Sequence, residues 1–152
     1  SRRSHLAQIW TQTAAYYYDV NNVQTYSGGT EATAFNPRAV NAMHRAGFLI
    51  DKRDNSDNPL YMVQFSVDGP EIHAFSKTYE DEFNPQKDFC AVMTCSQADE
   101  ACPVVLGASQ RVSITYEDPK DFDGTPQEAE MYDERCQQIS REMFYLISKV
   151  NQ

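Results

Sequence analysis

The end of the chain most constrains the fold, because it predicts one long helix with a single apolar face. Thr125-Pro126-Gln127-Glu128 has the pattern of a capping box, with Thr125 as N-cap, Pro126 at the first helical position and Glu128 at the third. We expect a helix of about 25 residues from this point, packed along one face. Its stripe comprises Tyr132, Cys136, Ile139, Met143, Leu146 and Val150, and it places Cys136 in the core.

Upstream, strand-like and helix-like segments alternate. Asn36-Pro37 is a strong helix start, and Gly47 is expected to end that helix. Asp68-Gly69 predicts a hairpin or tight turn between two strands. Helices are expected over 1–17 and 36–46, strands over 23–27, 60–65, 71–75, 89–94 and 111–115, and solvated loops over 51–58 and 79–88. The alternation predicts one domain over residues 1–152, with a parallel sheet covered on both faces.

The first helix begins with an unusual pair of charges. Ser1 or Ser4 could cap it, and Arg2 and Arg3 lie in its first turn, where the helix dipole prefers acidic side chains. An anion bound at this helix terminus would explain the two arginines, and solvated surface arginines are the alternative. Arg2 lies about 100° around the helix from Arg3 and is expected to face solvent. The apolar face comprises Leu6, Ile9, Trp10, Thr13 and Tyr17.

Two cysteines follow the most apolar predicted strand. Phe89–Thr94 reads as a buried strand, with Cys90 in the core, and Cys95 should lie at its carboxyl end, where open α/β sheets place ligand crevices. Cys102 follows after six intervening residues, a gap that fits a metal knuckle poorly. A transient disulfide on an adaptable loop is one interpretation. The other is that both thiols are buried fillers.

Composition excludes several classes of function. The net charge of −9 argues against nucleic-acid binding and against a polybasic membrane patch. No apolar run approaches the roughly 18–20 residues that span a bilayer, and no signal peptide is apparent. Four cysteines without framework spacing favour free thiols, so we expect a cytoplasmic protein. We expect no metal site and no cofactor.

Taken together, these residues resemble the low-molecular-weight protein tyrosine phosphatase fold, and more narrowly the thioredoxin-coupled arsenate reductases built on it. Ser1-Arg2-Arg3-Ser4 matches the end of that family's phosphate-binding loop, and Asp118-Pro119 matches its general acid. The reductases add a cysteine pair with the spacing of Cys95 and Cys102. The resemblance implies a three-layer α/β/α fold around a parallel sheet, with catalytic Arg3, Cys95, Cys102 and Asp118. It also implies oxyanion binding by Ser1, Arg2, Arg3 and Ser4.

One departure from the family concerns the nucleophile. The family's nucleophilic cysteine lies six residues before Arg3, and that position and the first strand precede Ser1. The sequence is therefore expected to be incomplete, or else a variant without the nucleophile.

The resemblance implies reduction of arsenate to arsenite, with thioredoxin as reductant. The alternatives are a phosphatase acting on phosphotyrosine or aryl phosphates, and a non-catalytic oxyanion-binding or redox module.

Overall fold

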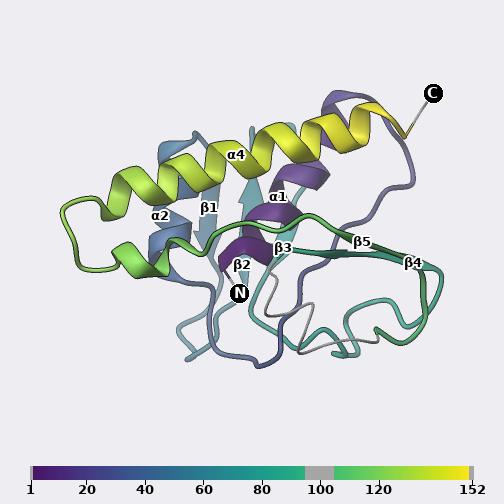
Figure 1. Cartoon of the computed structure of the whole chain (residues 1–152), viewed down its shortest axis with the longest axis horizontal. Coiled ribbons are helices and arrows are strands. Elements are labelled where there is room, and N and C mark those ends of the chain that lie inside the picture. The colour runs from purple at the N-terminus through teal and green to yellow at the C-terminus, as the bar shows by residue number, and fades with distance from the viewer. Residues whose placement is uncertain (1, 95–104, 151–152) are drawn as a thin grey trace.

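The computed structural model describes residues 2–94 and 105–150, which form a mixed α/β structure. Helix α1 (Arg2–Tyr17) packs between helix α4 (Glu128–Ser148) and strand β3 (Ile72–Ala74), and helix α2 (Pro37–Arg45) packs against α4 (Figure 1). Leu6 and Ile9 of α1 are fully buried in the core cluster. The first helix is thus covered on both sides, as its apolar face requires.

The hairpin predicted around Asp68-Gly69 is confirmed. Strands β1 (Leu49–Lys52), β2 (Tyr61–Gln64) and β3 form an antiparallel sheet in that order. Strand β1 is not predicted by the sequence, because its residues are mostly exposed and Asp51 and Lys52 belong to a polar run that is typical of a surface loop. The expected three-layer parallel sheet is not present among residues 2–94 and 105–150.

The parallel component consists of β4 (Phe89–Met93) and β5 (Ala108–Ser113). Their register pairs Ala91 with Arg111 and Met93 with Ser113. Ala91 is the buried residue of β4, whereas Cys90 is exposed. The prediction of a fully buried strand with Cys90 in the core was therefore wrong, because only part of the strand is buried and Cys90 lies on its exposed part.

Residues 23–27 are not a strand, contrary to the prediction. Side chains of α1 bind their backbone instead: Gln12 Nε2 donates to the Val23 carbonyl at 2.9 Å, and the Thr25 N–H donates to Gln12 Oε1 at 3.0 Å. Gln8 Nε2 donates to the Thr25 carbonyl at 3.2 Å. Two glutamines thus supply the hydrogen bonds that a neighbouring strand would otherwise supply.

The predicted start of α2 is confirmed, whereas the predicted start of α4 is wrong. Asn36 caps α2 as predicted, with its Oδ1 accepting from the Arg38 N–H at 2.9 Å. The capping box at Thr125 was wrong: α4 begins at Glu128, and Thr125 Oγ1 donates back to the Phe122 carbonyl. Glu128 instead accepts from the Gly124 N–H at 2.8 Å.

The long stripe of α4 is confirmed in its first four members, which are buried and include Cys136. Near the end of the helix Ile147 is buried in place of Val150, which is exposed. Tyr17, at the end of α1, is also exposed, contrary to expectation. Within the described residues, no helix combines the length and hydropathy needed to cross a bilayer.

Candidate active site

Two charged residues that are far apart in the sequence meet at the start of α1. Arg3 NH2 lies 3.1 Å from Asp118 Oδ2, and Arg3 NH1 donates to the Tyr116 carbonyl at 2.7 Å. The Arg3 and Asp118 side chains are only 13% and 20% exposed, so the ion pair is partly desolvated. The structure therefore places the predicted loop arginine and the predicted general acid in direct contact.

The carboxyl end of β4 reaches the same place through backbone hydrogen bonds. Ile114 N donates to the Met93 carbonyl at 2.9 Å, and Tyr116 N donates to the Thr94 carbonyl at 3.0 Å. These bonds extend the alignment of β4 and β5 beyond their last paired residues. Thr94, which directly precedes Cys95 in the sequence, is thus one hydrogen bond from the residue whose carbonyl holds Arg3.

Asp118 is held in a defined conformation by the turn that follows it. It caps the short 3₁₀ helix η1 (Pro119–Phe122), and its Oδ1 accepts from the Lys120 N–H at 3.1 Å. The neighbouring Glu117 side chain is 92% exposed and pairs at 3.7 Å with Arg135. Of the two adjacent carboxylates, only Asp118 therefore faces the start of α1.

The other predicted site residues divide into two groups. Ser4 lies in the first turn of α1, one residue after Arg3, and is half-buried. Ser1, Cys95 and Cys102 lie outside the described residues, so their roles stay predictions.

Arg2 does not face solvent, and that expectation was wrong. Its Nε donates to the Tyr132 hydroxyl at 2.8 Å, and its NH2 lies 3.2 Å from Asp123 Oδ2. No periodicity in the sequence indicated this pairing, because its members are more than a hundred residues apart.

His5, which follows Ser4 in the first turn of α1, is buried. Its ring stacks on Phe35 at 4.3 Å and is 1% exposed. Burial lowers the pKa of His5 to about 3, and the positive charge of Lys77 contributes in the same direction. The imidazole is therefore neutral near pH 7 and belongs to the core beside the candidate site.

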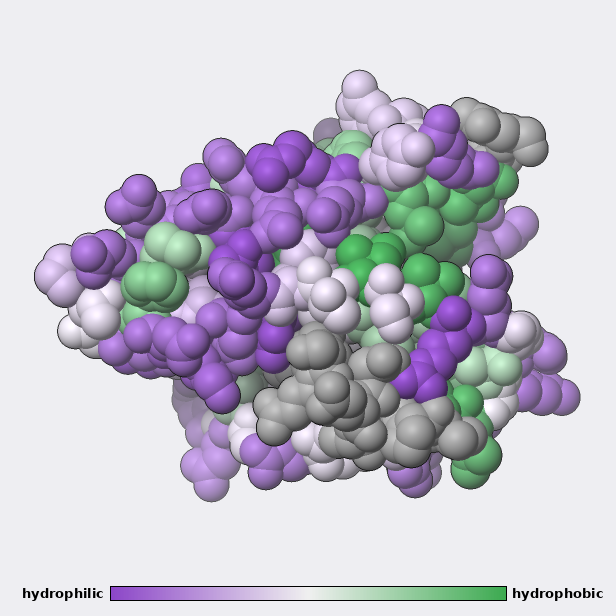
Figure 2. Space-filling model, in the orientation of Figure 1, coloured by the Kyte–Doolittle hydropathy of each residue, from purple (hydrophilic) through white to green (hydrophobic). Residues whose placement is uncertain are grey.

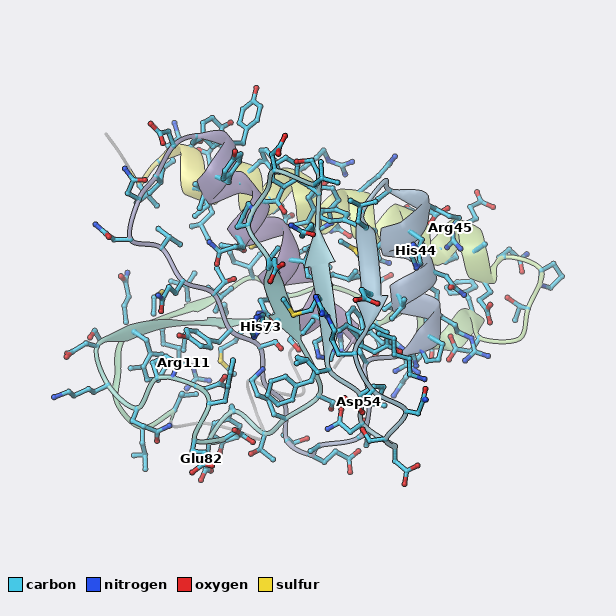
Figure 3. The ribbon with its side chains drawn as sticks, turned by 180° about the vertical axis from the view of Figure 1, so that it is seen from behind. His44, Arg45, Asp54, His73, Glu82 and Arg111 are labelled. Atoms are coloured by element: carbon cyan, nitrogen blue, oxygen red, sulfur yellow. The ribbon has the colours of Figure 1, made fainter. Side chains whose placement is uncertain are left out.

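The remaining histidines do not gather into a site. His44 on α2 and His73 on β3 are both exposed and lie on different elements (Figure 3). Within residues 2–94 and 105–150, no cluster of three or more His, Cys, Asp or Glu side chains could hold a metal ion.

Lys77 is a buried amine that the sequence analysis missed. It is 2% exposed, and its Nζ lies 4.3 Å from the Phe75 ring centroid and 5.4 Å from that of Phe83. Within the part of the chain that the structure describes, its Nζ has no hydrogen-bond partner, and burial lowers its pKa to about 8 despite the opposing charge of Asp81. The only sequence signal for this burial is that Lys77 lies between two phenylalanines along the chain.

The Lys77 amine predicts an unusual alkaline stabilisation. Because the native state loses its proton near pH 8 and the unfolded state near 10.5, the unfolded state binds more protons between these values, and stability rises with pH. Relative to Lys77→Met, the wild-type free energy of unfolding should rise by about 2 to 3 kcal/mol between pH 7 and pH 10. Urea titrations at both pH values measure it; a constant difference between the two proteins would contradict the buried-amine interpretation.

The Cys136 thiol is part of the core, as predicted. It is 3% exposed, accepts from Trp10 Nε1 at 3.3 Å and lies 3.6 Å from Met43 Sδ. Burial raises its pKa, so the thiolate form is disfavoured. Cys136 therefore has the surroundings of a packing residue.

A surface groove lies away from the Arg3–Asp118 pair. This groove, of about 390 Å³, runs between Ile114 and the carboxyl-terminal half of α4, where apolar surface gathers (Figure 2). Its lining comprises Ile114, Arg141, Glu142, Tyr145, Leu146 and Lys149. A smaller hollow, of about 30 Å³, lies beside Arg38 and Tyr132, and neither Arg3 nor Asp118 lines it.

Comparison with known proteins gives one distant relationship. No protein-family model matches the chain. Over 128 residues it is 29% identical to an arsenate reductase of Halalkalibacterium halodurans, an alignment that covers 84% of this chain and 73% of that protein. The chain is distantly similar to an arsenate reductase. That similarity points to an enzyme of this kind.

Proposed function

We propose that the full-length protein is an arsenate reductase that converts arsenate to arsenite through a cysteine relay regenerated by thioredoxin. The observation that carries the proposal is the hydrogen-bonded path from Thr94 through Tyr116 to Arg3 and Asp118. It brings a helix amino terminus, a guanidinium and a carboxyl group to the end of the strand that precedes Cys95. The distant similarity to a protein named arsenate reductase supports the same assignment.

The proposal includes the complete fold of the low-molecular-weight phosphatases. In that fold the parallel pair β4–β5 would belong to a larger parallel sheet, whose first strand and nucleophilic cysteine would precede Ser1. The parallel register of β4 and β5 supports this arrangement.

In the first step, the oxyanion binds at the amino terminus of α1. Backbone N–H groups of the loop ending at Ser1 and Arg2, the Ser4 hydroxyl and the Arg3 guanidinium would bind its oxygens. The thiolate preceding Ser1 attacks arsenic, forming a sulfur–arsenic bond. Asp118 protonates the oxygen whose bond to arsenic breaks, so water rather than hydroxide leaves.

The next steps transfer two electrons to arsenic. The Cys95 thiolate attacks the sulfur of the adduct, forming a disulfide, and the electron pair of the sulfur–arsenic bond stays with arsenic, which leaves as arsenite. The Cys102 thiolate then attacks Cys95 and releases the first cysteine as its thiolate. The Cys95–Cys102 disulfide is reduced by the dithiol of thioredoxin, which completes the cycle.

A second candidate function follows from the same Arg3–Asp118 pair. Together with the nucleophilic cysteine that the proposal places before Ser1, an arginine that binds a dianion and a carboxyl group that protonates a leaving oxygen would also support hydrolysis of aryl phosphates through a phosphocysteine that water then hydrolyses. Such a phosphatase would not use Cys95 or Cys102. Release of phosphate that survives Cys95→Ser would favour it.

Arsenate-dependent NADPH oxidation by the full-length protein, coupled through thioredoxin and thioredoxin reductase, tests the proposal. Cys102→Ser should lower steady-state turnover at least about tenfold, because the first disulfide is no longer resolved. Cys90→Ser is the matched control, since Cys90 is exposed on β4 and is not assigned to the relay. Equal turnover in wild type and Cys102→Ser would contradict the reductase mechanism.

A further inference from the structure

The segment that carries Asp118 is held at both ends by consecutive arginines of α1. Asp118 caps the start of η1 and pairs with Arg3, while Asp123 follows η1 and pairs with Arg2. Because Arg2 and Arg3 are neighbours on one helix, the two contacts fix the turn relative to the start of that helix. The two ion pairs differ in the additional hydrogen bonds that stabilise them.

Tyr132 of α4 completes the second contact. Its hydroxyl accepts from Arg2 Nε at 2.8 Å and donates to Asp123 Oδ1 at 2.7 Å. The residue is fully buried, and burial raises its pKa to about 12, so the hydroxyl keeps the proton that it donates. Arg2, Asp123 and Tyr132, which we name the anchor triad, therefore use both Asp123 oxygens.

A further ion pair joins this anchor to α2 and α4. Arg38 Nε lies 3.7 Å from Asp123 Oδ1 and also binds Glu128. Glu128 in turn accepts from the Gly124 N–H. The backbone directly after Asp123 is thus tied to the beginning of α4.

An oxyanion at the start of α1 would compete with Asp118 for the Arg3 guanidinium. Arg3 NH2 is the atom that pairs with Asp118 Oδ2, so a bound dianion weakens that contact. The anchor triad uses neither Arg3 nor Asp118, so its contacts do not depend on the ion pair that an anion would weaken. It is the part of the structure that can keep Asp118 near the reacting oxygen at that moment.

We propose that Arg2, Asp123 and Tyr132 are positioning residues that hold the Asp118 segment in place while Arg3 binds the oxyanion. This inference rests on the proposed function and assigns to Arg2 a contact with the protein rather than with the anion. Displacement of a catalytic group by about 1 Å can cost on the order of a hundredfold in rate. Loss of the triad should therefore lower kcat more than it raises KM.

Tyr132→Phe in the full-length protein tests the positioning role, because it removes one hydroxyl and keeps the buried ring. We expect kcat for arsenate, or for an aryl phosphate, to fall about tenfold with less than about a threefold change in KM. Tyr145→Phe, the same change on an exposed tyrosine of α4, is the control and should leave both parameters unchanged. Arg2→Lys is a second variant that leaves the buried ring intact and should show the same split.

Amide hydrogen exchange gives a readout that does not depend on activity. In the wild type, Asp123 and Gly124 should stay protected when inorganic phosphate is added, whereas in Tyr132→Phe phosphate should accelerate their exchange. Equal exchange in the two proteins with phosphate, together with unchanged kcat, would overturn the inference. If the wild type reduces no arsenate and hydrolyses no aryl phosphate, the proposed function fails, while the exchange result still decides whether the triad holds the segment.

Discussion

Replacing Arg3 with lysine should lower kcat/KM for the oxyanion substrate of the full-length protein by about 10²- to 10⁴-fold. Lysine keeps the positive charge but loses the planar fork that binds two oxygens at once. It also loses the present contacts to the Tyr116 carbonyl and to Asp118. The change thus removes both a ligand for the anion and a contact to the general acid.

Steady-state kinetics with arsenate and with an aryl phosphate measure this effect. Arg45→Lys is a matched control, because Arg45 is also a helical arginine paired with an aspartate, Asp133, at 2.8 Å, but both side chains are exposed. The control should keep wild-type kcat/KM. Wild-type kinetics in Arg3→Lys would remove Arg3 from the proposed mechanism.

Acidification should destabilise the protein by about 3 kcal/mol between pH 7 and pH 4 through His5 alone. The folded pKa of about 3 lies below the ordinary value of 6.5, so in this range the unfolded state binds a proton that the native state does not. His5 thus contributes stability that is complete above pH 6.5 and is lost as pH falls toward 3. The buried imidazole against Phe35 is the physical cause.

Urea unfolding of wild type and His5→Gln at pH 7, 5.5 and 4 isolates this contribution, since the carboxylates titrate in both proteins. The stability advantage of the wild type over His5→Gln should shrink by about 3 kcal/mol across the range. His44→Gln removes an exposed histidine of α2 and should leave the pH dependence unchanged. An advantage that stays constant with pH would contradict a buried neutral His5.

The sequence predicted the elements whose signals are local. Asn36-Pro37 set the start of α2, the Asp68-Gly69 turn joined β2 to β3, and the stripe containing Cys136 identified α4. The sequence-based predictions were wrong where side chains form hydrogen bonds to backbone groups that were expected to have other partners. Thr125 donates to a preceding carbonyl rather than capping α4, and Gln8 and Gln12 bind a segment that had the pattern of a strand.

The candidate site was predictable in part. Arg3 and Asp118 were named from the resemblance, and their contact joins residues 115 positions apart. The anchor triad and the buried Lys77 were not foreseen, because a charged side chain carries no pattern that shows which distant partner will desolvate it. Burial of His5 likewise depends on Phe35, which reaches it only after α1 packs into the core.

By itself, the sequence determined where helices and turns form, because capping and periodicity act over a few neighbouring residues. Only the tertiary structure decided which arginine meets which aspartate and which histidine and lysine lose their contact with water. Those outcomes depend on electrostatic interaction and desolvation between groups that the folded chain brings together. The chemistry proposed at the start of α1 depends on that long-range assembly.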